Sequence, residues 1–251
     1  MKFKLSFLFC LSMLVAQAQP NQVDSQGRKQ GEWGKIYPGT RVYMYKGQFK
    51  NDKPIGKFTY FYKSSKVKAV VEHDDNSNRS VAYYYHENGA FMSHGIYLNQ
   101  LKDSIWVNFG PSERLSNTET YSRGELHGKK VIYFIPEDPS NKSQIPSEVM
   151  MYANGVLSGE YKAYHRNLKV KTTGSYVDNK KHGVWMEYDL EGKKYSMTRF
   201  KNGIRHGWSI IYNASGNEYL RQYYYYGKPL SGDALKEKMK QLKELGLSPN
   251  G

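Results

Sequence analysis

Three histidines stand at the same place in a recurring phrase of the sequence. His127, His182 and His206 each come directly before a glycine, and a column of imidazoles is a candidate set of zinc ligands. Equivalent positions in neighbouring two-stranded units are separated by two strand spacings, about 9.5 Å. All ligands of one zinc ion must reach it at about 2 Å. The spacing therefore argues against a shared ion, and we expect no metal site.

The acidic stretch EHDDNSN, residues 72–78, has the look of a calcium-binding loop. It lacks the central glycine that such a loop needs for its sharp turn, and Tyr85 stands where the twelfth-position glutamate belongs. We therefore interpret the stretch as a polar turn that carries two solvated carboxylates, Asp74 and Asp75.

Motifs of nucleophilic, phosphate-binding or metalloprotease chemistry do not occur in the sequence. It contains no Gly-x-Ser-x-Gly elbow, no phosphate-binding glycine loop and no His-Glu-x-x-His pair. The single cysteine, Cys10, falls in the N-terminal leader described next. We expect a protein that is not an enzyme, with no catalytic residue, no cofactor and no metal.

Residues 1–18 read as a signal peptide. MKFK supplies a basic start, LSFLFCLSMLVA an apolar run and AQA a cleavage site of small residues, after which Gln19 becomes the N-terminus. The run is too short to span a bilayer. A lipoprotein anchored through Cys10 is disfavoured, because Phe9 stands where a small residue is needed. The sequence predicts an exported protein: periplasmic, cell-surface or extracellular.

The composition favours a thin β structure. Only 39% of the 251 residues are hydrophobic, yet 15% are aromatic and 23 are tyrosines, which suits large amphipathic rings on a half-buried sheet. The formal charge is +14, and loss of the leader with Lys2 and Lys4 lowers it to about +12. An acidic surface, polymer or protein is the expected partner, and no nucleic acid is expected.

A repeat of about 24 residues organises the rest of the chain. Its anchor is a glycine, or twice a serine, that precedes an aromatic-rich run, and successive anchors lie 24 or 25 residues apart except for one interval of 31. That interval holds an insertion, PEDPSNKSQIP, at residues 136–146. The anchors are Gly31, Gly56, Ser80, Ser104, Gly128, Gly159, Gly183, Gly207 and Gly232.

Aromatic residues recur at fixed distances from the anchors. One column lies five residues after the anchor, as in Tyr188, and another lies seven residues before the next anchor, as in Tyr176. A third column, two residues after the anchor, has the opposite strand parity to the first. Regular strands would place these two columns on opposite faces, whereas a bulge would bring them together. The rings either form the packed core or leave a platform for sugars or other flat ligands.

Each unit is predicted to be a β-hairpin. The first strand begins at the anchor, and the second ends at a turn that lies four residues before the next anchor. At this turn position the residues are types that tolerate a left-handed backbone, with Gln100 as the exception. Because a lone hairpin is marginal in water, the units must stack. We expect about sixteen strands over residues 19–232 in one elongated antiparallel sheet, an all-β fold.

The stretch YKGQFKNDKPIGKFTYFY, residues 45–62, resembles a MORN repeat, and the halves GVWMEY and YANG resemble its bacterial, antitoxin-like variant. The resemblance covers residues 27–232 and departs from the pattern at Ser80, Ser104 and the insertion. It implies a meander of β-hairpins and a scaffold function.

Residues 233–251 break the repeat. Leu235, Met239, Leu242 and Leu245 fall on one face of a helix that Asp233 would cap and Gly246 would stop. Such a helix either covers the last strand or binds a membrane surface or partner; we favour the cap, because the apolar face carries no aromatic anchor.

Together these features predict a non-catalytic exported repeat scaffold that mediates protein or envelope-surface interaction. Its partner would be a protein or an anionic envelope component, with peripheral membrane contact as one form of binding. The alternative is an antitoxin-like protein that binds and neutralises a partner toxin. The leader counts against an antitoxin that acts in the cytoplasm.

Overall fold

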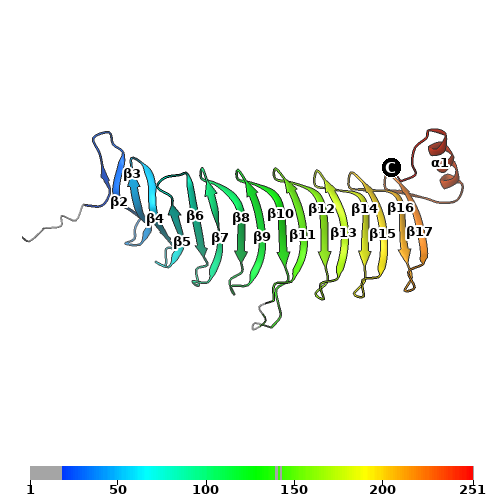
Figure 1. Ribbon diagram of the computed structural model, residues 1–251, viewed down its shortest axis with the longest axis horizontal. Coiled ribbons are helices and arrows are strands. Elements are labelled where there is room, and N and C mark those ends of the chain that lie inside the picture. Colours follow the sequence, from blue (N-terminus) through cyan, green and yellow to red (C-terminus); the bar gives the residue numbers. More distant parts are fainter. Residues whose placement is uncertain (1–18, 139–140, 142, 251) are drawn as a thin grey trace, which may run out of the picture.

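A computed structural model describes residues 19–138, 141 and 143–250. The predicted signal peptide, residues 1–18, lies outside the described residues. The described chain is one open sheet of 18 antiparallel strands followed by a single helix, α1, Gly232–Glu244 (Figure 1).

Each repeat of about 24 residues contributes two strands to the sheet. Their bounds are β1 Gln22–Val23, β2 Lys29–Ile36, β3 Tyr43–Lys50, β4 Lys53–Phe61, β5 Val67–His73, β6 Arg79–Tyr85, β7 Phe91–Leu98, β8 Leu101–Phe109, β9 Leu115–Ser122, β10 Glu125–Tyr133, β11 Pro146–Ala153, β12 Val156–Tyr164, β13 Val170–Val177, β14 Lys180–Tyr188, β15 Lys194–Lys201, β16 Ile204–Tyr212, β17 Glu218–Tyr225 and β18 Lys228–Leu230.

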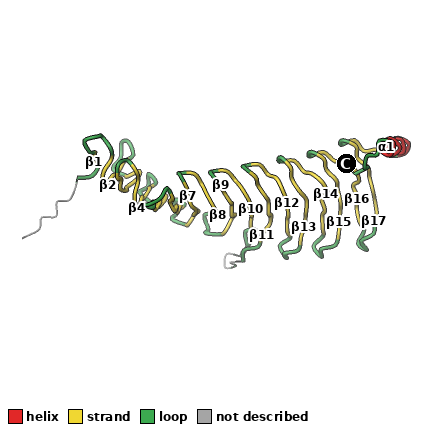
Figure 2. The backbone as a smooth tube through the Cα atoms, turned by 45° about the horizontal axis from the view of Figure 1, so that its top comes forward, coloured by secondary structure: helices red, strands yellow, loops and turns green. Residues whose placement is uncertain are grey.

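Every strand pairs with the next one along the chain, so the sheet is a simple meander. The molecule is correspondingly elongated, with β2 near one end and β17 near the other (Figures 1 and 2). The predicted all-β, single-sheet antiparallel architecture is confirmed. The full-length strands are β2–β17, the sixteen expected, and β1 and β18 add two and three residues at the ends.

Tight turns with two left-handed residues join most hairpins on one side of the sheet. Asp178 and Asn179, with φ of 49° and 63°, connect β13 to β14. Both residues at positive φ define the turn type whose twist matches that of paired strands. Gln100, which departs from the expected residue types, adopts φ of 64° all the same. The connection between β10 and β11, residues 134–145, contains the insertion except for Pro146, which begins β11, and it is the longest of the hairpin loops.

The anchor glycines do not begin the strands, and that prediction is wrong. Gly183 is the fourth residue of β14, has φ of +70° and lies where the pairing with β13 slips its register. Five anchor glycines are therefore β-bulges, at which a left-handed residue is inserted into one strand: Gly56, Gly128, Gly159, Gly183 and Gly207. Ser104 keeps this geometry with φ of 58°, whereas β5 and β6 pair through Ser80 without a slip. Gly232 is instead the first residue of α1.

The C-terminal helix begins after Ser231, whose side chain makes no capping hydrogen bond, and it ends before a left-handed glycine. Ser231, not Asp233, is the N-cap residue, and Asp233 lies in the first turn. Gly246, at φ of +64°, stops the helix as expected, with Leu247 N–H donating to Leu242 O at 2.8 Å. Leu242 is buried, but Leu245 is 70% exposed.

Two segments cover the C-terminal end of the sheet. β18 pairs with Tyr223–Tyr225 of β17, so the outer edge of residues 218–221 has no strand partner in the described chain. The tail returns to β16, where a Cβ built on Gly207 would lie 3.4 Å from Pro249 O and Asn250 Cα. Tyr223 is fully buried. No helix among the described residues is long and apolar enough to cross a membrane.

Candidate interaction surfaces

One aromatic column lies two residues after the anchor, and its large rings pack against glycines of the preceding strand. A Cβ built on Gly174 would lie 2.3 Å from the Trp185 ring, and Gly47 and Gly95 stand equally close to Phe58 and Trp106. These glycines lie nine residues before the next anchor. Sequence reasoning missed their role, although this regular spacing could have revealed it. Only glycine leaves room for a ring to lie flat against the neighbouring backbone.

A lysine covers the ring of three tryptophans in this column. Lys181 Nζ lies 4.1 Å from the ring centre of Trp185, and the pairs Lys29–Trp33 and Lys102–Trp106 repeat the contact at 4.9 and 4.3 Å. Trp106 and Trp185 are only 1% and 4% exposed. These two rings are thus packed core rather than a free binding platform.

The column five residues after the anchor belongs to a different set of rings. Phe91 packs against Tyr85, His94 and Phe109 at centroid distances of 5.7, 5.8 and 5.4 Å. No ring contact among the described residues joins this set to the set around Phe58 and Trp106. The two columns therefore occupy opposite faces, as unbroken parity predicts, and the bulges do not merge them.

The structure keeps the three anchor histidines apart. His127 Nδ1 lies 3.1 Å from Asn154 Oδ1, His182 is exposed, and His206 is 6% exposed between Tyr225 and Tyr226. Burial lowers the pKa of His206. The described residues contain no cluster of three or more His, Cys, Asp or Glu side chains placed to hold a metal ion.

Residues 72–78 form a hydrogen-bonded turn. Asp74 accepts hydrogen bonds from the backbone N–H of Asn76 and from Ser77 Oγ, both at 2.8 Å, and these bonds lower its pKa. Asp75 accepts one from the N–H of Gly56 at 3.1 Å. Both carboxylates thus serve the backbone of the turn and of the neighbouring unit.

Five exposed lysines gather on three adjacent strands, β3, β4 and β5. They alternate with the residues of the Phe58 face and so point to the other face. None of them forms an ion pair within the described chain, although Glu72 is the register partner of Lys57. We call this group the lysine patch: Lys46, Lys50, Lys53, Lys57 and Lys68.

The ring and glycine column is interrupted by polar pairs at two places. At the first, Lys130 forms an ion pair with Glu119 at 2.8 Å, and the two side chains are 23% and 15% exposed. Burial works to raise the pKa of Glu119, but hydrogen bonds from Lys130 and Tyr121 outweigh it and the pKa is lowered. Burial and the bond to Glu119 raise the pKa of Tyr121 to about 12.

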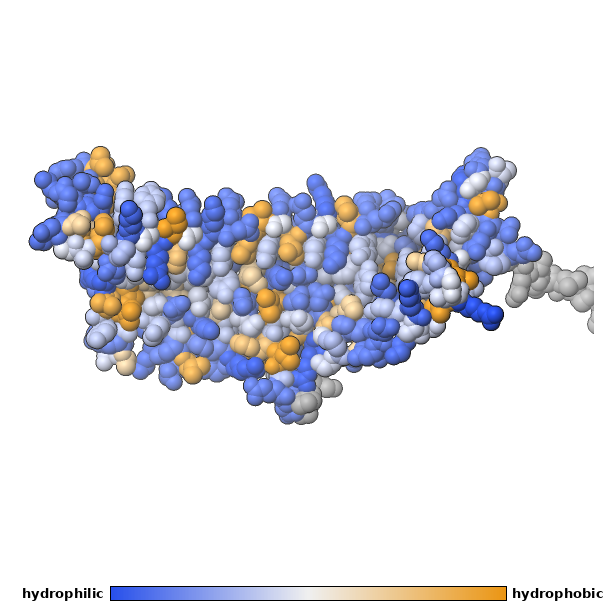
Figure 3. All heavy atoms as spheres, turned by 180° about the vertical axis from the view of Figure 1, so that it is seen from behind, coloured by the Kyte–Doolittle hydropathy of each residue, from blue (hydrophilic) through white to orange (hydrophobic). Residues whose placement is uncertain are grey.

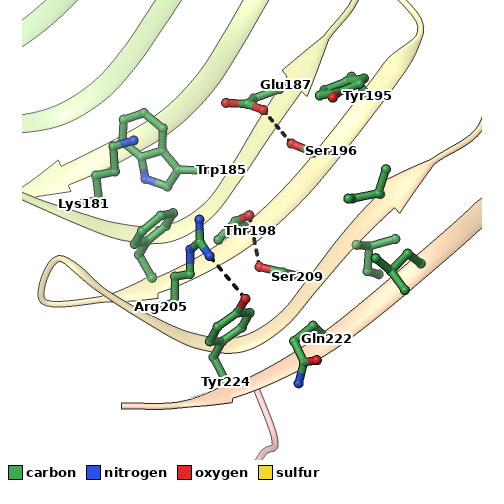
Figure 4. Close-up of a pocket in the computed structure, with 14 residues that line it drawn as sticks. Lys181, Trp185, Glu187, Tyr195, Ser196, Thr198, Arg205, Ser209, Gln222 and Tyr224 are labelled. Atoms are coloured by element: carbon green, nitrogen blue, oxygen red, sulfur yellow. Dashed lines mark hydrogen bonds between the residues drawn. The ribbon is translucent and has the colours of Figure 1, made fainter. Parts of the chain in front are cut away.

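At the second place, Ser209 and Thr198 stand where other units carry a ring and a glycine. Ser209 Oγ donates to Thr198 Oγ1 at 3.1 Å. These small side chains leave a hollow of about 380 Å³ on β14–β17 (Figure 4). We call it the polar hollow; its rim and walls include Lys181, Glu187, Tyr195, Arg205, Gln222 and Tyr224.

No protein-family model and no curated protein matches the sequence. The crystal structure of TarM shares 11% identity at a TM-score of 0.25, over 53% of this chain and 20% of that one. The crystal structure of TcdB2-TccC3-Cdc42 shares 7% identity at a TM-score of 0.19, over 76% and 14%. This chain thus spans a fifth or less of either neighbour, and similarities this low carry no argument about function.

Proposed function

We propose that the protein is a non-catalytic, exported repeat scaffold that binds an anionic component of the cell envelope through the lysine patch. The observation that carries the proposal is the set of five exposed lysines on one face of three neighbouring strands, without ion-pair partners in the described chain. Each cation attracts an anionic surface weakly, and several acting together add their contributions.

The repeat supports a scaffold role because it gives a long, open surface. Most of one face is hydrophilic with apolar side chains scattered over it, as the space-filling view in Figure 3 shows. The MORN resemblance of the sequence points the same way, and we propose that the chain is a divergent relative of that family.

Binding to vesicles and polymers tests the proposal. Purified protein from Gln19 onward should be retained on phosphatidylglycerol vesicles or an anionic envelope polymer, but not on phosphatidylcholine vesicles, at low salt. Retention should fall steeply as salt rises, since exposed charges are screened beyond about 8 Å at physiological ionic strength.

A triple variant tests whether the lysine patch carries this binding. K50Q/K53Q/K57Q should lose most of the retention, while K236Q/K240Q/K243Q on α1 removes the same charge and should retain it. Equal loss in both variants would show that net charge matters and the patch does not. If nothing anionic is retained even at low salt, a specific protein partner, such as the toxin of the antitoxin-like alternative, becomes the better explanation.

Export is tested separately. The secreted protein should begin at Gln19, because the cleavage site AQA ends at Ala18. N-terminal sequencing that finds Met1 or Cys10 at the start of the exported form would contradict this.

A further inference from the structure

We propose that the polar hollow is a binding site for an acidic saccharide, a sugar unit that carries a carboxylate or a phosphate. This inference deepens the proposed function and rests on it, because it names the class of envelope component that one surface would recognise. It concerns β14–β17, at the end of the sheet opposite to the lysine patch (Figure 1).

The hollow exists because one unit lacks its ring. In the preceding unit, Trp185 fills the column and lies against Gly174. The next unit has Ser209 and Thr198 there instead of a ring and a glycine, and the side chain of Arg205 extends between Trp185 and Tyr224 (Figure 4). The volume of the hollow, about 380 Å³, is within the range of small-ligand sites.

Two cations line the hollow. Arg205 Nη1 donates to Tyr224 Oη at 3.2 Å, and Lys181 rests over Trp185, yet neither forms an ion pair within the described chain. A guanidinium has five N–H donors, and one bond to a phenol leaves most of them for a ligand. The pair therefore suits a carboxylate or phosphate.

Glu187 and Tyr195, elsewhere in the lining of the polar hollow, suit the hydroxyl groups and the C–H face of a sugar. Glu187 accepts a hydrogen bond from Ser196 Oγ at 2.7 Å, and a carboxylate with two oxygens can accept more. A ligand beside it must donate hydrogen bonds, which sugar hydroxyls do and a bare phosphate or carboxylate does not. Tyr195, 57% exposed at the rim, offers an apolar ring to the C–H face of a sugar.

An acidic peptide fits these features less well. Extended peptides gain affinity by pairing their backbone with an open strand edge. The hollow lies on a face of the sheet: β14, β15 and β16 have both edges paired, and of β17 only the outer edge of residues 218–221 is open in the described chain. Only side chains face the hollow, so it suits a ligand recognised through rings, hydroxyls and charge.

The repeat itself supplies a variant that fills the hollow. T198G/S209W rebuilds the glycine and tryptophan pair present at Gly174 and Trp185, and so should occupy the space without disturbing the sheet. E119G/K130W makes the same change at the other polar pair, outside the hollow, and is the matched control. R205Q removes one cation with little change of volume, so it serves if the filled variant does not fold.

Calorimetric titration with trigalacturonate, maltotriose and a pentapeptide of glutamate provides the test. The native protein should bind trigalacturonate at least about tenfold more tightly than maltotriose, because only the former carries carboxylates. T198G/S209W should weaken binding by about tenfold or more and R205Q by about tenfold, the scale of one lost charged hydrogen bond. E119G/K130W should bind within about twofold of native. Circular dichroism checks that each variant is folded.

Several results would overturn the inference. They are unchanged binding by folded T198G/S209W and R205Q, equal affinity for maltotriose, binding of the peptide without the saccharide, or no heat with trigalacturonate at millimolar concentration. If the lysine patch still retains anionic envelope material in that case, only the saccharide site fails. Loss of retention as well would remove the proposed function.

Discussion

Gly174→Ala tests the packing of rings on glycines, the interaction that repeats along the sheet. The new Cβ would lie 2.3 Å from two atoms of the Trp185 ring, where ordinary contact begins near 3.4 Å. The ring must therefore move by about 1 Å. Tyr161, Tyr176 and Phe200 surround it at centroid distances of 5.2, 5.1 and 6.2 Å, and Lys181 lies over its face. Overpacking of this kind costs about 2–3 kcal/mol.

Urea unfolding followed by circular dichroism measures this cost. W185L removes the colliding ring, so G174A in that background should cost less than about 1 kcal/mol, and the double-mutant cycle should show a coupling above about 1 kcal/mol. If G174A costs the same with and without Trp185, the collision is not the cause and backbone freedom alone explains the glycine.

Four further predictions concern the bulge at Gly183, the ionisable groups Glu119 and Tyr121, and the C-terminal end. Gly183→Val should lower the free energy of unfolding by about 1–3 kcal/mol, and Gly183→Asn should lower it by less. The cost comes from the backbone φ of +70°, because no atom lies within 4 Å of a Cβ built on Gly183. Equal urea midpoints for the two variants would contradict this. The pKa of Glu119 is lower in the folded protein than its ordinary value of 4.5. The carboxylate therefore stabilises the fold above pH 4.5, and this stabilisation is lost as the pH falls through the pKa of the folded state. E119Q should reduce the dependence of the free energy of unfolding on pH in the acid range. The pKa of Tyr121 is raised to about 12, so stability should fall between pH 10 and about 12, and Y121F should remove that part of the fall. Deletion of residues 228–251 removes β18 and α1 and exposes Tyr223, so light scattering should detect aggregates. A monomeric molar mass and the urea midpoint of the undeleted protein would show that these segments do not protect the sheet.

The sequence alone determined the architecture, because the repeat is a local signal. Each hairpin contacts only its neighbours, so a period of about 24 residues with left-handed turn positions was enough to predict the strands and their antiparallel order. The parity of the two aromatic columns left two arrangements open, opposite faces in regular strands or one face through a bulge, and the structure shows opposite faces. The helix and its glycine stop followed from residues 232–247 in the same local way.

The contacts between strands needed the tertiary structure. The anchor glycine looked like a strand start, because a glycine before an apolar run reads as a boundary; it is a bulge, and only the pairing of β13 with β14 shows the slipped register. The packing of Trp185 on Gly174 joins residues of different strands: the glycine recurs nine residues before the anchor, but only the cross-strand contact shows that a ring lies on it. The polar hollow is likewise a missing ring, and it becomes visible only where the neighbouring strands bring Thr198, Ser209 and Arg205 together. Local sequence set each strand and turn, whereas cross-strand register decided which side chains meet.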